Sequence, residues 1–311
     1  MVKFHEVVRV QVPAKINLAL AVGPRRVDGF HDLTSVFQAV SVYDELTAVA
    51  RTDGQIILTM SGLGSTQLPT DEQNLAVRAA LLLRERRGRP EMGANLTIDK
   101  AIPIAGGMAG GSGDAAAALL GCNEIWDLEL SVDELRELGT EIGSDVPFAI
   151  LGGNAVGTGR GEKLTPLPAD GELNWVFALA EEGLSTPQVY RSFDQLAEAG
   201  ELTPDVHLDA GSLEALTSGD VNRCAAALRN DLCAAAVALR PALAATLAVS
   251  AEGVLASVLC GSGPTVAFLC TDEQSANLLA EKLPEHEGIR DAIPARGPVA
   301  GPSVVRSVVA G

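Results

Sequence analysis

A glycine-rich segment near the middle of the chain constrains the fold more than any other feature. It covers residues 103–113, reads Pro-Ile-Ala-Gly-Gly-Met-Ala-Gly-Gly-Ser-Gly, and leads into an alanine-rich stretch that predicts a helix from about Ser112 to Trp126. Glycine loses more conformational freedom on folding than any other residue, and it adds no side chain to a core. This many glycines favour a backbone that approaches a ligand closely; a tight strand-to-helix turn is the structural alternative.

The same loop has the features of an anion-binding site. The first turn of a helix has free N–H groups, and the helix dipole attracts negative charge there. The Walker motif is absent because no lysine follows the glycines, and the spacing does not fit the dinucleotide fingerprint G-x-G-x-x-G. The sequence therefore predicts a phosphate site that uses backbone amides, formed by Pro103, Ile104, Ala105, Gly106, Gly107, Met108, Ala109, Gly110, Gly111, Ser112 and Gly113.

The charge balance narrows the range of partners. The chain has 23 Lys and Arg against 40 Asp and Glu, which gives a formal net charge of −17. Sequence-independent binding to nucleic acid or to an anionic membrane needs a cationic face, so the composition argues against both. A phosphate ligand is still compatible, because backbone amides and Mg²⁺ can hold phosphate without net positive charge. We therefore expect a small-molecule ligand.

The length of the chain and the order of its predicted elements indicate two domains of the α+β class. At about 100–200 residues per domain, the 311 residues suffice for two. Strands and helices follow one another without strict βαβ alternation, which favours α+β over a doubly wound sheet. We place the boundary near residue 160, which divides the chain into domains 1–160 and 161–311.

Two local patterns predict where elements begin and end. Pro13 separates two predicted strands, 4–12 and 15–22. Thr70 and the glutamine three residues later have the spacing of a capping box, so we expect the first helix to begin near Thr70 and to end at Gly88.

The cysteines and the N-terminus indicate a soluble cytoplasmic protein. The chain has five cysteines, an odd number, and no two are spaced C-x-x-C, so neither a disulfide framework nor a zinc site is indicated. Arg9 and Lys15 interrupt any apolar core that a signal peptide would need. The sequence leaves the oligomeric state open between a monomer and a weak dimer.

Two charged residues stand in contexts that suggest chemistry. Lys15, in Pro-Ala-Lys-Ile-Asn-Leu, shares one face of its predicted strand with Asn17. A lysine in an apolar strand suggests a specific partner, and a solvated strand edge is the alternative. Asp145, in Gly-Ser-Asp-Val-Pro-Phe, lies between a predicted helix end and a predicted apolar strand, where a cap or turn role is the alternative to a functional carboxylate.

Two further segments carry aromatic residues that are candidates for contact with a ligand. Phe30 and His31 follow a predicted Asp-Gly turn, and Phe30 is a candidate stacking surface because aromatic residues make up only 4% of the chain. Thr186 is the expected N-cap of a later helix, with Pro187 at its first position. Tyr190 lies in the first turn of that helix, where a place in the helix core is the structural alternative.

Taken together, three segments resemble the motifs of the GHMP kinases, which phosphorylate small alcohols or acids with ATP. They are Pro-Ala-Lys-Ile-Asn-Leu, the glycine-rich loop, and the late Cys-Gly-Ser-Gly-Pro-Thr, and matching segments run in order from about residue 9 to 270. The resemblance implies an N-terminal α+β domain and a ferredoxin-like C-terminal domain with the active site between them. ATP would be the phosphoryl donor and Mg²⁺ the cofactor.

Within the family, Asp-Gly-Phe-His, Gly-Ser-Asp-Val-Pro-Phe and Ser-Thr-Pro-Gln-Val-Tyr are similar to the branch that acts on a cytidylylated methylerythritol. That likeness implies transfer of the γ-phosphoryl group of ATP to the 2-hydroxyl of this alcohol, a step of non-mevalonate isoprenoid synthesis. Lys15 and Asp145 match the catalytic pair. The positions that match substrate-binding residues are Asn17, Phe30, His31, Thr186 and Tyr190, with Phe30 and Tyr190 enclosing the cytosine and His31 reading its edge.

The resemblance also assigns residues to the nucleotide. Asn74 and Lys100 match positions that line its pocket, and Ser112 is the expected Mg²⁺ contact at the end of the phosphate loop. Some positions depart from commoner spellings: Met108-Ala109 stands where leucine-glycine is frequent, and Asp114 where asparagine is frequent. Asp114 puts the local charge near the phosphates in question.

Two alternatives compete with this interpretation. A homoserine or mevalonate kinase of the same family would have no base to stack, so the Asp-Gly-Phe-His and Ser-Thr-Pro-Gln-Val-Tyr segments argue against it. A catalytically inactive sensor or RNA-binding relative is opposed by the net charge of −17 and by the presence of both Lys15 and Asp145.

Overall fold

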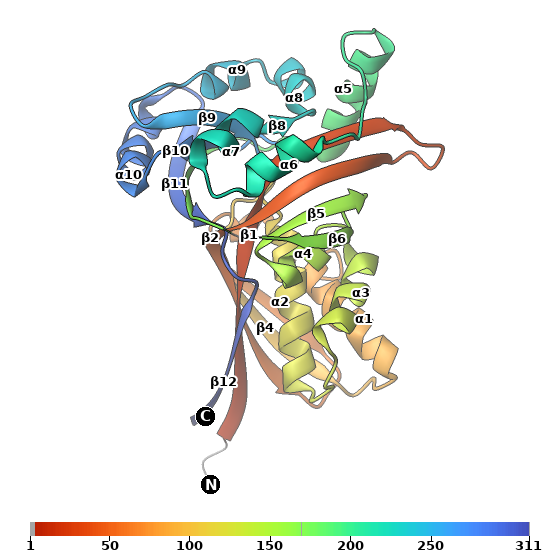
Figure 1. Cartoon of the computed structure of the whole chain (residues 1–311). Coiled ribbons are helices and arrows are strands. Elements are labelled where there is room, and N and C mark those ends of the chain that lie inside the picture. Colours follow the sequence, from red (N-terminus) through yellow and green to blue (C-terminus); the bar gives the residue numbers. More distant parts are fainter. Residues whose placement is uncertain (1–3, 169, 311) are drawn as a thin grey trace.

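The computed structural model describes residues 4–168 and 170–310, which form two domains joined by a long strand pair. In Figure 1 the lower domain is a sheet covered by helices on one side, and the upper domain holds a second sheet with its own helices. The first sheet has the order β12-β1-β2-β4-β3, with β5 beside β2, β6 beside β5 and β8 beside β1. Its strands are β1 (Phe4–Arg25), β2 (His31–Arg51), β3 (Ile56–Gly62), β4 (Gly93–Lys100), β5 (Asn154–Gly159), β6 (Lys163–Leu167), β8 (Arg229–Asn230) and β12 (Ser303–Ala310).

The strand pair β1–β2 belongs to both domains. Val8, Val10 and Val12 of β1 pack in the core beneath the first-domain helices, whereas Ile16 and Leu18 pack against the second sheet. Figure 1 shows the pair, in red and orange, running from the lower domain into the upper one. The pair therefore places its central residues at the junction of the domains.

The prediction of two strands separated at Pro13 was wrong. β1 continues through Pro13, and its register with β2 shifts between Pro13 and Ala14. Such a shift marks a bulge, where a residue without an N–H is tolerated because the ladder is already interrupted. Because β1 is uninterrupted, it extends beyond the core of the first domain and places Lys15 at the domain junction.

Four helices cover the first sheet, and small side chains let one of them lie close to it. Ala115–Ala118 are fully buried, and a Cβ atom on Gly121 would lie 3.1 Å from Leu46 Cδ2. The alanine-rich stretch after the glycine-rich loop is thus a buried helix, as expected. The helices are α1 (Leu75–Arg87), α2 (Gly110–Ile125), α3 (Val132–Ile142) and α4 (Val146–Leu151), and a short 3₁₀ helix covers Ser65–Gln67.

The first helix begins later than the capping-box spacing predicted. Its N-cap is Asn74, whose side chain accepts a hydrogen bond from the Ala76 N–H, so the box expected at Thr70 is wrong. The predicted end is confirmed, because Gly88 adopts the left-handed conformation with φ 61°. An asparagine side chain caps as well as a threonine, and nothing in the spacing alone decides between them.

The second domain is ferredoxin-like, as expected. Its four strands alternate with helices in the order βαββαβ and form an antiparallel sheet, β11-β7-β10-β9. The strands are β7 (Leu173–Ala180), β9 (Val254–Leu259), β10 (Val266–Cys270) and β11 (Ile289–Gly297). The helices are α5 (Thr186–Glu198), α6 (Ala210–Thr217), α7 (Val221–Ala227), α8 (Cys233–Leu239), α9 (Ala242–Leu247) and α10 (Glu273–Lys282), with a 3₁₀ helix at Leu283–Glu285.

The first sheet extends beyond the boundary placed near residue 160. That position lies in the turn between β5 and β6, and β6 pairs with β5. β12 then returns from the far end of the sequence to pair with β1 along Phe4–Gln11. The first domain is therefore built from two separate stretches of the chain.

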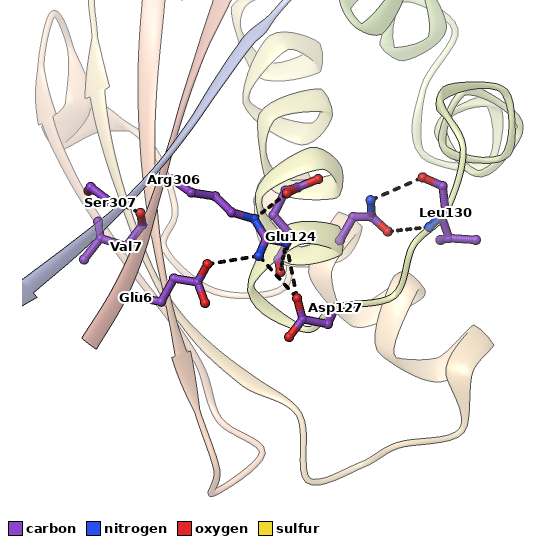
Figure 2. A network of polar contacts seen from close by, with 8 residues as sticks. Glu6, Val7, Glu124, Asp127, Leu130, Arg306 and Ser307 are labelled. Carbon is purple, nitrogen blue, oxygen red and sulfur yellow. Dashed lines mark hydrogen bonds and ion pairs between the residues drawn. The ribbon is translucent and has the colours of Figure 1, made fainter. Parts of the chain in front are cut away.

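An arginine fastens the returning strand to the first domain (Figure 2). Arg306 of β12 lies 2.6 Å from a carboxylate oxygen of Glu124, donates to the Glu124 carbonyl at 2.9 Å, and reaches Asp127 at 3.2 Å. It also lies 3.0 Å from Glu6 on the neighbouring strand. One guanidinium thus joins β12, β1 and the C-terminal end of α2.

We expect Arg306→Ala to loosen β12. A single exposed ion pair is worth about 0–1 kcal/mol, and Arg306 combines several contacts, so the loss of unfolding free energy should be about 1 kcal/mol. Thermal unfolding and amide exchange of the β12 residues would measure it. Arg223→Ala is the control, because Arg223 forms an exposed ion pair with Glu214 at 3.0 Å. An equal effect of both substitutions would contradict the role of Arg306.

All five cysteines are free thiols, and Cys122, Cys224, Cys260 and Cys270 are buried. Among the described residues, every helix is too short or too polar to cross a bilayer.

Candidate active site

A cavity of 530 Å³ lies where the two domains meet, and both contribute to its wall. The first domain supplies Lys15 and Asn17 of β1, the glycine-rich loop and Asp145; the second supplies residues of α5 and of the turn between β9 and β10. Residues that are far apart in the sequence are thus brought together around one space.

The glycine-rich loop forms much of this wall. Ala105, Gly107 and Ala109 have positive φ angles of 51°, 78° and 62°, and α2 starts directly after them at Gly110. The bends direct the start of α2 toward the cavity, where its free N–H groups favour an anion. The loop residues in the wall are Pro103, Ile104, Ala105, Gly106, Gly107, Ala109, Gly110, Gly111 and Ser112.

Two loop residues do not line the cavity. Met108 is fully buried among residues of the domain junction, and its carbonyl accepts a hydrogen bond from the Lys15 N–H at 3.2 Å. Gly113 faces Val12, 3.4 Å from where its Cβ atom would be. Both residues anchor the loop to β1.

The loop also packs tightly against the second domain. A Cβ atom on Gly107 would lie 1.8 Å from the carbonyl oxygen of Cys260, closer than any real contact. Only glycine allows this approach, and the positive φ of 78° is a conformation that glycine adopts without steric cost. Gly107 therefore holds the loop in register with the turn between β9 and β10.

Lys15 is held in place by polar neighbours on its own strand pair. Its Nζ donates to Asn17 Oδ1 at 2.8 Å, and Asn17 Nδ2 donates to Ser35 Oγ at 2.8 Å. The Lys15 amine also lies 5.7 Å from the centre of the Phe37 ring, within range of a cation–π contact. The expected lysine–asparagine face of the strand is thus a buried polar network rather than a solvated edge.

Asp145 faces Lys15 across the cavity wall. Its Oδ2 atom lies 3.8 Å from Lys15 Nζ, and its side chain is 32% exposed against 8% for the lysine. Asp145 occupies the N-cap position of α4, but its side chain makes no capping hydrogen bond. The carboxylate is consequently free to contact a ligand, and the segment after it is a helix rather than the apolar strand that was expected.

Lys100 is enclosed by two carboxylates behind the loop. Its Nζ contacts Asp44 and lies 2.7 Å from Asp114 Oδ2, with the side chains 1–3% exposed. Asp44 also accepts hydrogen bonds from the N–H groups of Ala101 and Ile102 at 2.7 and 2.8 Å. This arrangement fixes the segment that enters the loop.

Within this cluster, the carboxyl group of Asp114 has a shifted pKa. Burial raises its pKa to about 7, against the opposing effect of the Lys100 ammonium. Its second oxygen, Oδ1, is buried without a hydrogen-bond partner in the described structure. The Lys100 amine would lie 3.3 Å from a Cβ atom on Gly110, so the cluster lies directly under the start of α2.

Asn74 shapes the cavity wall mainly by holding the neighbouring backbone in place. Its side chain caps α1 and donates to the Pro69 carbonyl at 2.9 Å. Both ends of the amide are therefore engaged, and the residue shapes the 68–75 side of the cavity.

A second cavity of 460 Å³ adjoins the first. Phe30 and His31 line it from one side and Tyr190 from the other. The two cavities share wall residues, which are Leu33, Ser144, Arg160, Thr186 and Tyr190. The structure thus brings together the two aromatic segments that the sequence keeps 160 positions apart.

The aromatic residues of this second cavity differ in exposure. Phe30 is 52% exposed, and the Arg160 guanidinium lies 5.3 Å from the centre of its ring. The Tyr190 and His31 ring centroids are 5.0 Å apart, and burial raises the pKa of the Tyr190 hydroxyl well above its ordinary value, with a smaller contribution from the Asp145 carboxylate. Tyr190 thus combines packing against the domain core with a place in both cavity walls.

Thr186 is not the N-cap that the sequence predicted. The N-cap of α5 is Ser185, and Thr186 is the first helical residue. Its hydroxyl instead lies 2.7 Å from Ser262 Oγ, in the turn between β9 and β10. This contact joins α5 to the turn that packs on the glycine-rich loop.

Three residues of the site region were missed by the sequence analysis. Arg160 follows Gly159 and precedes Gly161, both with positive φ, a pattern that signals a turn but no ligand. Asp194 lies one helical turn after Tyr190, and Asp44 lies within an apolar strand. The role of each residue follows only from its neighbours in space, and these neighbours are distant in the sequence.

The donor set fits a Mg²⁺ ion that arrives with a nucleotide better than a protein-held ion. The described residues contain no cluster of three or more His, Cys, Asp or Glu side chains that could hold a metal. Mg²⁺ prefers oxygen ligands and is commonly held by substrate phosphates with one or two protein oxygens. Ser112 and Asp145 offer such oxygens in the cavity wall, and a Cβ atom on Gly143 would lie 3.9 Å from Ser112 Oγ.

The family model for the GHMP kinases N terminal domain matches residues 74–153, and the model for GHMP kinases C terminal matches residues 212–288. These regions contain the glycine-rich loop with Asp145, and the part of the second domain from α6 to the end of the 3₁₀ helix after α10. The family proposed from the motifs is therefore confirmed.

Named relatives cover nearly the whole chain. A 4-diphosphocytidyl-2-C-methyl-D-erythritol kinase of Streptomyces coelicolor is 50% identical over 300 residues, 96% of this chain and 99% of its own. One of the same name from Mycobacterium tuberculosis is 48% identical over 96% of this chain and 93% of its own.

Solved structures agree in fold. A crystal structure of 4-(cytidine 5'-diphospho)-2C-methyl-D-erythritol kinase superposes with a TM-score of 0.73 at 32% identity, over 93% of this chain and 98% of that one. A homoserine kinase from Cytophaga hutchinsonii reaches the same TM-score at 18% identity, over 96% of this chain and 97% of that one, and shares the fold alone. The chain therefore belongs to the GHMP kinase family, and within it to the group of 4-diphosphocytidyl-2-C-methyl-D-erythritol kinases.

Proposed function

We propose that the protein transfers the γ-phosphoryl group of ATP to the 2-hydroxyl of 4-diphosphocytidyl-2-C-methyl-D-erythritol, in the non-mevalonate route to isoprenoids. One observation carries the proposal: the Lys15–Asp145 pair lines a cavity walled by the glycine-rich loop, and this cavity adjoins one lined by Phe30, His31 and Tyr190. The first space suits a polyphosphate and the second a nucleoside base. The reacting pair lies in the wall of the first, and Ser144, next to Asp145, lines both.

The Asp145 carboxylate is the group that takes the proton of the attacking hydroxyl. The alcohol oxygen bonds to the γ-phosphorus as the bond to the β–γ bridging oxygen breaks, and ADP leaves with that electron pair. Lys15, whose Nζ lies 3.8 Å from Asp145 Oδ2, stabilises negative charge on the transferred group. Its hydrogen bond to Asn17 keeps the amine aimed at this point.

The glycine-rich loop and the start of α2 bind the phosphates of ATP through backbone N–H groups. Mg²⁺, when bound with the nucleotide, would neutralise charge on the phosphate oxygens. The Ser112 hydroxyl would contribute a protein oxygen to that ion. Lys100, enclosed by Asp44 and Asp114, supports the loop from behind rather than reaching across it.

The second cavity holds the cytidylyl group of the acceptor. Phe30 and Tyr190 stack on the base, and His31 contacts its edge. Arg160 lines both cavities and is suited to bind the diphosphate that links the base to the reacting alcohol, because a guanidinium pairs well with phosphate oxygens.

Tyr190→Ala tests this assignment of the second cavity. A base–aromatic stack is worth about 1–3 kcal/mol in nucleic-acid-binding proteins, so the Kd for the cytidylyl substrate should rise by roughly 5–150-fold. The Kd for ATP should change little, because the phosphate loop is intact. Calorimetry with each ligand, together with the melting temperature, measures the effect.

Val189→Ala is the matched control for the packing of the same helix, because Val189 is fully buried in α5 and lines neither cavity. It should lower the melting temperature without selective loss of the cytidylyl ligand. If Tyr190→Ala instead lowers the melting temperature and weakens both ligands equally, Tyr190 is helix core and the base site lies elsewhere.

A further inference from the structure

A carboxylate outside the reacting centre contacts the histidine of the second cavity. Asp194 Oδ1 lies 2.8 Å from His31 Nε2, and Asp194 Oδ2 lies 3.8 Å from Arg25 Nε. Asp194 follows Tyr190 by one turn of α5, so one face of the helix presents both the ring and the carboxylate. All four side chains line the 460 Å³ cavity.

The His31 ring is held rigidly. Its side chain is 4% exposed, and its centroid lies 5.0 Å from that of Tyr190 and 5.9 Å from that of Phe193, which meets it edge-on. In the part of the chain that the structure describes, only Nε2 of this ring has a hydrogen-bond partner. Nδ1 is therefore the ring nitrogen left for a ligand.

The Asp194 carboxylate determines whether Nδ1 of His31 donates or accepts a hydrogen bond. An ionised carboxylate only accepts hydrogen bonds, so the ring nitrogen beside it carries the proton, and in the neutral imidazole Nδ1 is then a bare acceptor. At C4, cytosine presents an amino donor, whereas uracil presents a carbonyl acceptor in the same place. An Nδ1 acceptor matches the first and opposes the second.

We infer that Asp194 is a positioning residue that fixes the tautomer of His31 and thereby makes the site select cytosine over uracil. The inference rests on the proposed function, because it takes a cytidylyl group as the ligand of this cavity. A uracil in the same position would leave two acceptors facing each other. An unmatched polar group in a buried site corresponds to about a 5–150-fold difference in affinity.

The binding of CDP and UDP to wild type and to Asp194→Asn tests the inference. Wild type should bind CDP more tightly than UDP by about 5–150-fold. The asparagine keeps the shape, but its amide N–H can donate to Nε2 and move the ring proton to Nδ1, so the preference should disappear or invert. The affinity for ATP should not change.

Two additional measurements separate positioning from a structural role. Two-bond ¹⁵N–¹H spectra report which ring nitrogen of His31 is protonated, and the proton should move from Nε2 to Nδ1 in Asp194→Asn. Glu198→Gln is the control, because it removes the same charge from an exposed place one turn further along α5. It should change neither the spectrum nor the CDP preference.

The outcomes distinguish this inference from the function on which it rests. If wild type prefers CDP and Asp194→Asn keeps that preference with the His31 proton in place, the inference alone is wrong. Equal losses for CDP and UDP with a lower melting temperature would assign Asp194 a structural role and also overturn it. If wild type binds neither nucleotide, the cytidylyl assignment fails and the inference fails with it.

Discussion

Asp145→Asn is expected to lower kcat by about 10²–10⁴-fold, the usual effect of losing a general base. The asparagine has the same shape but cannot accept the proton of the attacking hydroxyl. The Asp145 side chain makes no capping hydrogen bond to α4, so the helix should remain in place. ATP binding should survive, because the phosphate loop is untouched. Steady-state turnover and ATP-induced thermal stabilisation measure the two effects separately.

The matched control is Asp133→Asn, in which the same change is made at a side chain that is 88% exposed on α3. Its turnover should equal that of wild type. Should Asp145→Asn keep more than roughly half of the wild-type kcat, Asp145 is a turn residue and the base must be sought elsewhere, since a lost general base costs at least about 10²-fold.

Gly107→Ala is expected to disrupt the junction of the two domains. Its Cβ atom would lie 1.8 Å from the Cys260 carbonyl oxygen, and backbone cannot move aside as a flexible side chain can. Overpacking costs about 1–3 kcal/mol and a left-handed alanine about 1–2 kcal/mol, so we expect a loss of about 2–5 kcal/mol in unfolding free energy. Thermal and urea unfolding without ligand measure it.

Gly111→Ala provides the control in the same loop. A Cβ atom there would meet only Leu75 Cδ1, at 3.8 Å, and the residue lies within α2, where alanine is favoured. Its stability should be unchanged or slightly higher. Equal stability of Gly107→Ala and wild type would show that the loop does not approach the Cys260 carbonyl, and would contradict the described packing of the domains.

The local parts of the site could be predicted from the sequence, because each depends on residues close together in the chain. The glycine-rich loop and its helix form one continuous segment, and the Lys15–Asn17 face follows from the two-residue period of a strand. The ferredoxin-like domain followed from the family resemblance rather than from the predicted elements alone.

The parts that depend on distant contacts could not be predicted. The roles of Asp44 and Asp194 depend on their contacts with Lys100 and His31, which lie 56 and 163 positions away in the sequence. The continuation of β1 through Pro13 depends on a bulge opposite β2, and a proline alone signals only an interruption.

The pairing of β1 with β12 has a consequence for how the protein is made. The hydrogen bond between Ser307 and Val7 joins residues 300 positions apart, so the ribosome adds 300 residues before this edge of β1 receives its partner. Until then a long, valine-rich strand edge is open to pairing with another nascent chain, which is a known route to aggregation. During synthesis, the edge of β1 that β12 covers in the folded protein stays unpaired until the residues of β12 have been made.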